Sequence, residues 1–297
     1  MNLLIWNCQG AASKAINRVI KDVKRRFNPR ILGLIEPRVS GYQADEICKK
    51  MGFENWLRVE ATGFSGGIWV FWQDDMKLEI VHTHSQFVLV RVKVGHQALW
   101  LLSIVYGSPN ATLRKKLWHD LSLDNLNIEG PWCSIGDYNS VISDDEIEPQ
   151  RNSAHHRSPE FADWIFNQAM IDMGFKGSKF TWTRGQSSDT HKSARLDRGL
   201  CNLEWKDMFP DSHITHLPII QSNYAPLILN LSDKNKSESG RIFRFQAAWL
   251  THKEFPKVIK AEWDNRQNME DNILKMASIL SNWNRTTFGN IQKIKGG

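Results

Sequence analysis

Short apolar runs and longer amphipathic stretches alternate along most of the chain. The apolar runs are rich in β-branched or aromatic residues and are bounded by turn residues, which is typical of β-strands. They cover residues 3–7, 31–36, 67–72, 87–94, 99–106 and 132–136. Helical spacing of apolar residues covers residues 13–27, 40–51, 110–123 and 158–173, which begin at the candidate N-caps Ser13, Ser40, Asn110 and Ser158. The pattern predicts a mixed α/β chain with packed sheets, and short links between residues 64 and 106 predict an antiparallel meander there.

The composition indicates a packed globule. Of the 297 residues, 41% are apolar and 13 are tryptophan, which argues against disorder. No run of roughly eighteen apolar residues occurs, so the sequence predicts no membrane span. The N-terminal segment lacks the basic stretch and the cleavage site of a signal peptide, so we expect an intracellular protein. The scattered cysteines are expected to be buried free thiols: Cys8, Cys48, Cys133 and Cys201.

The positive charge is concentrated towards the C-terminal end. Residues 1–232 hold 26 basic and 25 acidic side chains, a net of +1, whereas residues 233–297 hold 12 and 7, a net of +5. The body alone is therefore not expected to be a strongly cationic nucleic-acid binder.

The last part of the chain predicts a linker followed by a helical tail. Residues 233–240 are polar and turn-rich, as linkers are. In residues 241–297, one helical face carries Ile273, Ala277, Leu280 and Asn284, with Trp283 beside them. We expect this apolar face to have no partner within the tail itself.

Polar residues end several of the predicted apolar strands. Glu36 ends one such run, where a carboxylate is poorly tolerated unless it has a role or a partner. Asn7 ends the first strand, and Asp137 and Asn139 end a later one, with a spacing that puts both side chains on one side of an extended segment. Each residue alone also fits an ordinary role as a turn former, a surface acid or a cap. Together they are suited to phosphodiester hydrolysis, which needs oxygen ligands for a divalent cation and a group that orients water.

Eight short segments occur in a fixed order along residues 1–232. They are Trp-Asn-Cys-Gln-Gly, Leu-Ile-Glu-Pro-Arg, Ser-Gly-Gly-Ile-Trp, Val-Tyr-Gly-Ser-Pro, Gly-Asp-Tyr-Asn, Phe-Thr-Trp-Thr-Arg, Arg-Leu-Asp-Arg and Asn-Tyr-Ala-Pro-Leu. In this order they resemble the endonuclease/exonuclease/phosphatase superfamily, and within it the apurinic-type endonuclease domain of plant LINE-type (non-LTR) retrotransposons. The tail segments Phe-Arg-Phe-Gln-Ala-Ala-Trp-Leu and Phe-Gly-Asn-Ile resemble the connector to a reverse transcriptase, which would be an ancestral partner in cis and is expected to be missing here.

The resemblance implies a DNase I-like, four-layer α/β sandwich, in which two packed mixed β-sheets are flanked by helices. It implies that Glu36, Asn7 and Asn223 hold Mg²⁺, or Mn²⁺ in its place, with no small-molecule cofactor. The partner would be DNA and the compartment the nucleus, with no membrane association. A hairpin between the Phe-Thr-Trp and Leu-Asp-Arg strands would reach into a DNA groove through Arg184, Lys192 and Arg195.

The resemblance also assigns catalytic roles. Tyr106 and Asn139 would contact the phosphate, and Asp137 would orient or activate the attacking water. Asp197 would fix the tautomer of a histidine and stabilise its cation. The chain departs from the family at that histidine, because the family ends in Ser-Asp-His and this sequence has Ser222, Asn223 and Tyr224.

The replacement of the family's Asp-His by Asn223 and Tyr224 changes the expected activity. Asn223 loses a negative charge, and Tyr224, with an ordinary pKa near 10, can donate to a phosphate oxygen but is a poor base at neutral pH. We therefore expect an endonuclease domain by descent, made to nick DNA for retrotransposon integration, with hydrolysis impaired by several orders of magnitude. The alternatives are an active endonuclease, a non-catalytic DNA-binding remnant, and a phosphatase of the same fold.

Other polar clusters are given ordinary roles. His213 and His216 lie just upstream on a predicted strand. If one of them faces the cleft, its imidazole is the alternative to a site without the family's histidine. His82, His84, His155 and His156 are expected to be surface or core histidines. The acidic run from Asp144 to Glu146 is expected to be a solvated loop and not a metal site.

Overall fold

The computed structural model describes residues 1–62, 65–95, 98–149, 158–185, 187, 190–231, 249, 252–264, 272, 275–276, 279–280 and 283. The chain divides into two compact units, Met1–Lys236 and Ser237–Gly297. The first holds β1 (Asn2–Asn7), α1 (Lys14–Phe27), β2 (Ile31–Ile35), α2 (Gly41–Lys50), β3 (Asn55–Thr62), β4 (Ser65–Trp72), β5 (Met76–His84), β6 (Phe87–Val94), β7 (Trp100–Tyr106), α3 (Ala111–Asp120), α4 (Leu123–Leu126) and β8 (Trp132–Asp137). It continues with η1 (Asp144–Glu146), β9 (Ile147–Glu148), α5 (Pro159–Asn167), β10 (Ile171–Asp172), β11 (Lys176–Gly177), β12 (Trp182–Arg184), β13 (Lys192–Ala194), β14 (Asp197–Cys201), α6 (Leu203–Met208), β15 (His213–His216) and β16 (Leu227–Asn230), and the second unit holds α7 (Phe255–Glu262).

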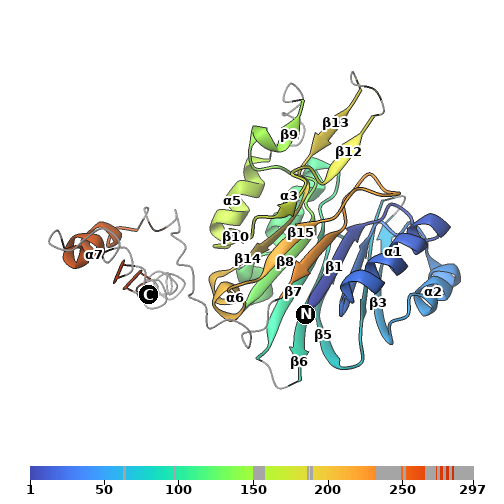
Figure 1. The fold of residues 1–297 in the computed structure, drawn as a ribbon, viewed down its shortest axis with the longest axis horizontal. Helices are drawn as coiled ribbons and strands as arrows, with labels where there is room; N and C mark the ends of the chain where they lie inside the picture. Colours follow the sequence, from blue (N-terminus) through green and yellow to red (C-terminus); the bar gives the residue numbers. More distant parts are fainter. Residues whose placement is uncertain are drawn as a thin grey trace. The chain divides into compact units, whose positions relative to one another are not determined.

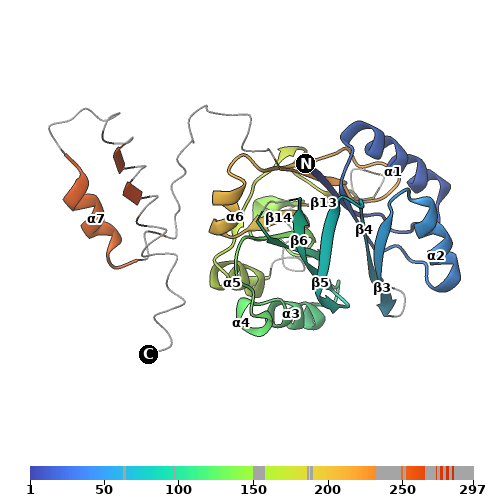
Figure 2. The same ribbon diagram turned by 90° about the horizontal axis from the view of Figure 1, so that it is seen from below.

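Two mixed β-sheets and a small antiparallel sheet of β12, β13 and β9 form the first unit (Figure 1). The seven-stranded sheet has the order β11-β15-β16-β1-β2-β4-β3, and the six-stranded sheet has the order β10-β14-β8-β7-β6-β5. Each contains a parallel pair, β1 with β2 and β7 with β8, among antiparallel neighbours. Helices α1 and α2 cover the outside of the first sheet, and α3, α4 and α5 cover the outside of the second (Figure 2). The predicted α/β sandwich is confirmed.

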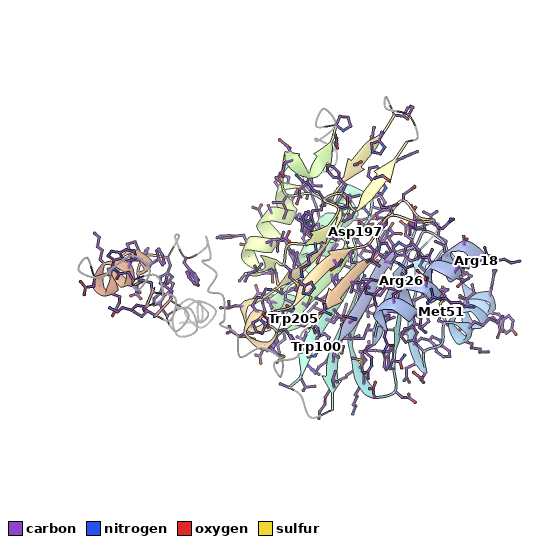
Figure 3. The ribbon with its side chains drawn as sticks, in the orientation of Figure 1. Arg18, Arg26, Met51, Trp100, Asp197 and Trp205 are labelled. Atoms are coloured by element: carbon purple, nitrogen blue, oxygen red, sulfur yellow. The ribbon has the colours of Figure 1, made fainter. Side chains whose placement is uncertain are left out.

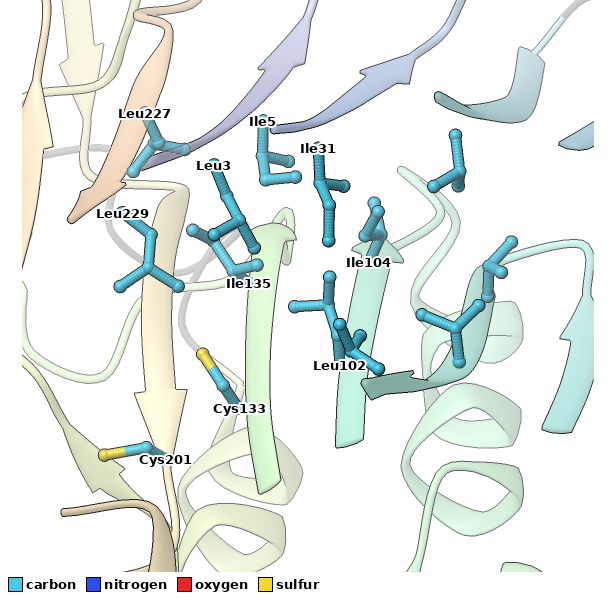
Figure 4. Close-up of a cluster of buried hydrophobic side chains, with 14 of the residues drawn as sticks. Leu3, Ile5, Ile31, Leu102, Ile104, Cys133, Ile135, Cys201, Leu227 and Leu229 are labelled. Carbon is cyan, nitrogen blue, oxygen red and sulfur yellow. The ribbon is translucent and has the colours of Figure 1, made fainter. Parts of the chain in front are cut away.

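The interior strands β1, β2, β7 and β8 bury both of their faces, and alternate residues serve different layers. On β1, Leu3 and Ile5 face the other sheet, whereas Leu4 and Trp6 pack under the helices. Figure 4 shows the inter-sheet layer, where side chains of β1 and β2 meet those of β7 and β8. Burial on both faces explains why these strands occur in the sequence as continuous apolar runs.

The packing corrects the prediction of a single meander between residues 64 and 106. β5, β6 and β7 do form an antiparallel meander, but β4 pairs with β2 and β3 in the other sheet. The residues from Ile68 to Phe71 are all fully buried, as the interior position of β4 requires. The strands β3 and β5 were not predicted, because their exposed and half-buried residues weaken the apolar signal.

Helix boundaries follow the predicted caps at their N-terminal ends. The side chain of Asn110 accepts hydrogen bonds from the first turn of α3, and that of Ser158 accepts one from Phe161. Ser13 and Ser40 also occupy N-cap positions, without a side-chain hydrogen bond. The helix predicted for residues 158–173 ends earlier, at Asn167, because residues 171–172 pair with β14 as β10.

The second unit has an apolar cluster of its own. Trp249 and Phe255 pack against Met276, Leu280 and Trp283, and the Trp249 and Trp283 rings lie edge to face with centroids 6.3 Å apart. The prediction that the tail lacks an internal partner is therefore wrong. The linker at residues 233–240, together with Ile273, Ala277 and Asn284, lies outside the described residues.

Two other predictions from composition can be compared with the structure. All four cysteines are free and buried. None of the helices in the described residues is long and apolar enough to cross a membrane.

Candidate active site

Polar side chains from both sheets meet at one end of the sandwich. Asn7 ends β1 beside Ile35, the last residue of β2, and Glu36 follows directly. In the other sheet, Tyr106 is paired with Asp137, and Asp137 with Asp197, so β7, β8 and β14 bring these three side by side. In Figure 3, Asp197 lies towards the end that carries the β12–β13 hairpin, away from Trp100 and Trp205.

Two hydrogen bonds join the sheets at this end. The amide Nδ2 of Asn7 donates to Oδ2 of Asp137 at 2.9 Å, and the hydroxyl of Tyr106 donates to Oε1 of Glu36 at 2.7 Å. All four residues are buried, with at most 6% of their surface exposed. Buried polar groups keep such bonds because an unmade one is costly, so the two contacts hold the strand ends in place.

Asp137 is the most heavily hydrogen-bonded group of the site. Its Oδ1 accepts from the backbone N–H of Asn139 at 2.9 Å, and its Oδ2 accepts from the Asn139 amide at 3.2 Å as well as from Asn7. The Tyr224 hydroxyl also hydrogen-bonds to it. Burial nevertheless raises the pKa of Asp137 to about 7, and the negative charge of Glu36 adds to the rise.

A glycine sets the approach of this carboxylate. Gly136 has φ +149°, and a Cβ placed on it would lie 2.1 Å from the carbonyl oxygen of Val105 on the neighbouring strand. No other residue fits there without moving the backbone. The glycine of Gly-Asp-Tyr-Asn therefore allows β7 and β8 to pair as far as Tyr106 and Asp137.

Asp197 is buried with little to stabilise its charge. Its side chain is fully buried, and neither carboxylate oxygen has a hydrogen-bond partner of regular geometry, although the Thr181 hydroxyl accepts from its backbone N–H. Burial and the charge of Asp137 raise the pKa of Asp197 well above its usual range. Two adjacent buried carboxylates thus oppose each other's ionisation.

Tyr224 points into this group, whereas Asn223 does not. Tyr224 is 6% exposed, and its backbone carbonyl accepts a 3.0 Å hydrogen bond from the indole of Trp6. Burial raises the pKa of its hydroxyl well above the ordinary value, and the charges of Asp137 and Asp197 raise it further. Asn223, the next residue back along an extended segment, is exposed, and among the described residues its side chain makes no hydrogen bond to Glu36 or Asn7.

The three residues predicted to contact DNA fall into two groups. β12 and β13 form the predicted hairpin, in which Arg184 and Lys192 are cross-strand partners and both are exposed. Arg195 is only 7% exposed and forms ion pairs with Glu146 at 3.0 Å and Asp172 at 2.8 Å. A guanidinium held by these two carboxylates is not free for a phosphate, which argues against the DNA contact predicted for Arg195.

A buried ion-pair network lies behind the hairpin, and the sequence did not reveal it. Arg198 is fully buried and donates to Glu146 at 2.8 Å and to Asp172 at 3.0 Å. Glu146 is therefore paired and buried, which corrects the prediction of a solvated loop at that residue, whereas Asp144 and Asp145 are exposed as predicted. The only signal in the sequence was the presence of two arginines in Arg-Leu-Asp-Arg, with no indication of which acids they would meet.

The histidines predicted as substitutes are engaged elsewhere. His216 lies 2.7 Å through Nδ1 from the Ser178 carbonyl oxygen and stacks on Phe175 with ring centroids 4.7 Å apart. Burial lowers its pKa to about 4. His213 lies 3.2 Å through Nδ1 from the carbonyl oxygen of Asp211. Neither contact brings an imidazole to Asp197.

The donors present fit a magnesium ion. Oδ1 of Asn7 is buried and has no hydrogen-bond partner, although a buried polar oxygen is costly to leave unpaired. Glu36 follows Ile35, the cross-strand partner of Asn7, and the charge of Glu36 acts on Asp137, to which the Asn7 amide donates. Mg²⁺ takes one or two carboxylates and keeps several waters, so it needs no larger cage. The described residues contain no group of three or more histidine, cysteine or acidic side chains arranged to hold a metal.

Comparisons with known proteins identify the fold. The endonuclease domain of TRAS1, a telomere-specific non-LTR retrotransposon, matches with a TM-score of 0.54 and 12% identity over 78% of this chain and 99% of that chain. The APE2 catalytic domain of Xenopus laevis matches with a TM-score of 0.57 and 15% identity over 78% and 91% of the two chains. A mannosyl-6-phosphatase of Bacteroides thetaiotaomicron matches with a TM-score of 0.54 and 10% identity over 78% and 100%. No protein-family model matches the sequence, and no curated protein matches it.

At such low identities the matches establish the fold and nothing finer. The first unit has the DNase I-like fold of the endonuclease/exonuclease/phosphatase proteins, as the resemblance implied. Nucleases and phosphatases both use this fold, so the chemistry has to be argued from the site.

Proposed function

We propose that residues 1–232 are a Mg²⁺-dependent phosphodiesterase domain that descends from the DNA-nicking endonucleases of plant LINE-type retrotransposons and hydrolyses DNA slowly. The observation that carries the proposal is the meeting of Asn7, Glu36, Tyr106 and Asp137 at one end of the sandwich, joined by two inter-sheet hydrogen bonds. A carboxylate and an unpaired amide oxygen stand next to a phenol and a second, poised carboxylate, which is the equipment that phosphodiester hydrolysis needs.

Each residue has a separate task in this proposal. Glu36 and the free Oδ1 of Asn7 hold the cation, which when bound neutralises charge on the phosphate. Tyr106 offers a hydroxyl to a phosphate oxygen. The amide of Asn139, which donates to Gly107 and Asp137 in this structure, exchanges its longer bond to Asp137 for one to the phosphate. Asp137 accepts a proton from the attacking water, since a pKa of about 7 is close to the value at which a general base works best near neutral pH.

Tyr224 is the reason for slow hydrolysis. It occupies the place where an imidazole would act on the reacting group, next to Asp137 and Asp197. A phenol whose pKa is raised further stays protonated at neutral pH, so it donates a hydrogen bond but is a poor base for the attacking water. Asp197 then has no cation to stabilise. Removing a general acid or base costs roughly 10²–10⁴-fold in rate.

DNA is the proposed partner of the domain. Arg184 and Lys192 lie opposite each other on an exposed hairpin, where two cations can contact phosphates on either side of a groove. Residues 233–240 serve as a linker in this proposal, and residues 241–297 as the connector that joined the domain to a reverse transcriptase. A nuclear location follows from the substrate.

A second candidate is a DNA-binding remnant without turnover. The observation that favours it is the complete burial of Asp197 beside Tyr224, because a site that no longer ionises and exchanges protons retains only its binding contacts. DNA affinity would then persist while hydrolysis is absent.

A plasmid-nicking assay in Mg²⁺, repeated in Mn²⁺, separates these candidates. The parent chain is compared with Asn223→Asp/Tyr224→His and with Glu36→Ala as the cation-site control. We expect the double variant to nick about 10²-fold faster or more, because it regains an imidazole next to Asp197, and Glu36→Ala to show no nicking. Equal rates for the parent and the double variant contradict the impairment, and no nicking by either one contradicts the phosphodiesterase assignment.

A further inference from the structure

The turn that follows β2 folds an arginine back onto the proposed cation ligand. Glu36 and Arg38 both have left-handed backbone conformations, with φ values of +51° and +53°, on either side of Pro37. A non-glycine residue seldom adopts this conformation, and two of them around a proline make a tight local reversal. As a result, Nη2 of Arg38 lies 2.6 Å from Oε2 of Glu36.

Both oxygens of the Glu36 carboxylate are therefore occupied. Oε1 accepts from the Tyr106 hydroxyl, and Oε2 accepts from Arg38. Tyr106 is fixed at the end of an interior strand and is 2% exposed. The Arg38 side chain is 47% exposed, whereas that of Glu36 is 7% exposed, so the arginine is the donor with room to leave.

The geometry points to a competition. We propose that Arg38 is a built-in counter-ion of Glu36 that competes with the divalent cation and so sets the cation concentration at which the site fills. A cation that binds Oε2 has to displace the guanidinium, and it binds against the positive charge of Arg38. The inference rests on the proposed function in one respect, because it takes Glu36 to be the cation ligand.

Charge arithmetic gives the direction and the rough size of the effect. Removing one positive charge a few ångströms from a divalent cation favours binding of the cation. Because solvent near the protein surface screens the repulsion, the expected gain is about tenfold in affinity. A purely structural role for Arg38 gives the opposite sign, since losing a contact that orders Glu36 would weaken cation binding. The sign of the change therefore distinguishes the two roles.

The chain supplies a matched control. Arg91 pairs with Glu79 at 3.0 Å between β6 and β5, and its side chain is 38% exposed, close to the exposure of Arg38. This pair has the same chemistry but involves none of the site residues. Arg91→Met therefore measures what loss of an arginine and its net charge does in general.

The test is calorimetric titration of the full-length chain with MnCl₂ and, separately, MgCl₂ at low ionic strength. Parent, Arg38→Met, Arg38→Lys, Arg91→Met and Glu36→Gln are compared, with the cation-induced rise in the thermal unfolding midpoint as a second readout. We expect Arg38→Met to bind the cation about tenfold more tightly, Arg38→Lys and Arg91→Met to match the parent, and Glu36→Gln to lose the site. If Arg38→Met does not fold, Arg38→Gln takes its place, because it keeps a polar side chain without the charge.

Each outcome of these titrations supports or overturns the competition between Arg38 and the cation. Tighter binding in Arg38→Met alone supports the competition, including the case in which the parent binds no cation and the variant does. Cation binding that depends on Glu36 but is unchanged or weaker in Arg38→Met overturns the competition and leaves the proposed function standing. Absence of Glu36-dependent binding in both parent and Arg38→Met overturns both.

Discussion

Replacing Asp197 by asparagine is expected to stabilise the protein at alkaline pH and to flatten the pH dependence of its stability. Asp197 and Asp137 are direct cross-strand partners on β14 and β8, and both are fully buried. Neither carboxylate oxygen of Asp197 has a hydrogen-bond partner of regular geometry. Asparagine has the same shape and no charge, so it removes the repulsion without opening a cavity.

The size of the effect follows from the raised pKa of Asp137. A carboxyl whose pKa rises on folding from 3.8 to about 7 favours folding fully at acid pH, and this contribution is lost as pH rises through the folded value. Each pH unit of that interval corresponds to about 1.4 kcal/mol, so the cost approaches about 4 kcal/mol at most when Asp137 is ionised. Asp197, whose pKa is also raised, adds to the loss in the same direction.

Urea unfolding at pH 5 and pH 8 in the presence of EDTA measures this effect. We expect the parent to lose about 2–4 kcal/mol of unfolding free energy over the interval and Asp197→Asn to lose clearly less. Asp145→Asn is the control, because Asp145 is exposed and its hydrogen bond with Lys179 lowers its pKa to about 2, outside the interval. Parallel curves for the parent and Asp197→Asn would refute the reasoning, since they would mean that the two carboxyls do not interact.

Two further predictions concern the ion-pair network and the tail. Arg198→Met is expected to lower the unfolding free energy by about 3–5 kcal/mol, because Glu146 and Asp172 then share only the cation of Arg195 between their two charges. The exposed Arg184→Met should change it little, and similar urea midpoints for the two variants would contradict the network's role. Deleting residues 241–297 is expected to weaken DNA binding and to reduce the slope of log Kd against log salt, because the segment beyond residue 232 has a net charge of +5. Filter binding at several salt concentrations measures this slope. An unchanged slope would show that the tail does not touch DNA.

Tyr224 and Arg195 illustrate where reading the sequence succeeded and where it failed. The order of the motifs singled out position 224 as the departure from the family, and the structure places its side chain beside Asp137. Arg195 belongs to an equally recognisable motif, yet its side chain turns inward to Glu146 and Asp172. The motif showed that both positions matter but not which way each side chain points.

Asn223 shows the same limit over a single residue. Its neighbour Tyr224 is buried and Asn223 is exposed, because successive residues of an extended segment point to opposite sides. The sequence placed both in the site, and only the pairing of Tyr224 with Trp182 determines which of the two faces inward.

The sequence by itself determined the strands, the helix starts and the polar residues at the strand ends, because apolar periodicity, caps and turn residues act over a few neighbouring positions. Only the tertiary structure decided that β4 joins β2 and not β5, that Arg198 meets Glu146, and that Asn7 reaches Asp137 across 130 residues of chain. These contacts depend on which strand ends become neighbours when two sheets close over one core. That choice is made by packing among all the strands at once, so no local pattern records it.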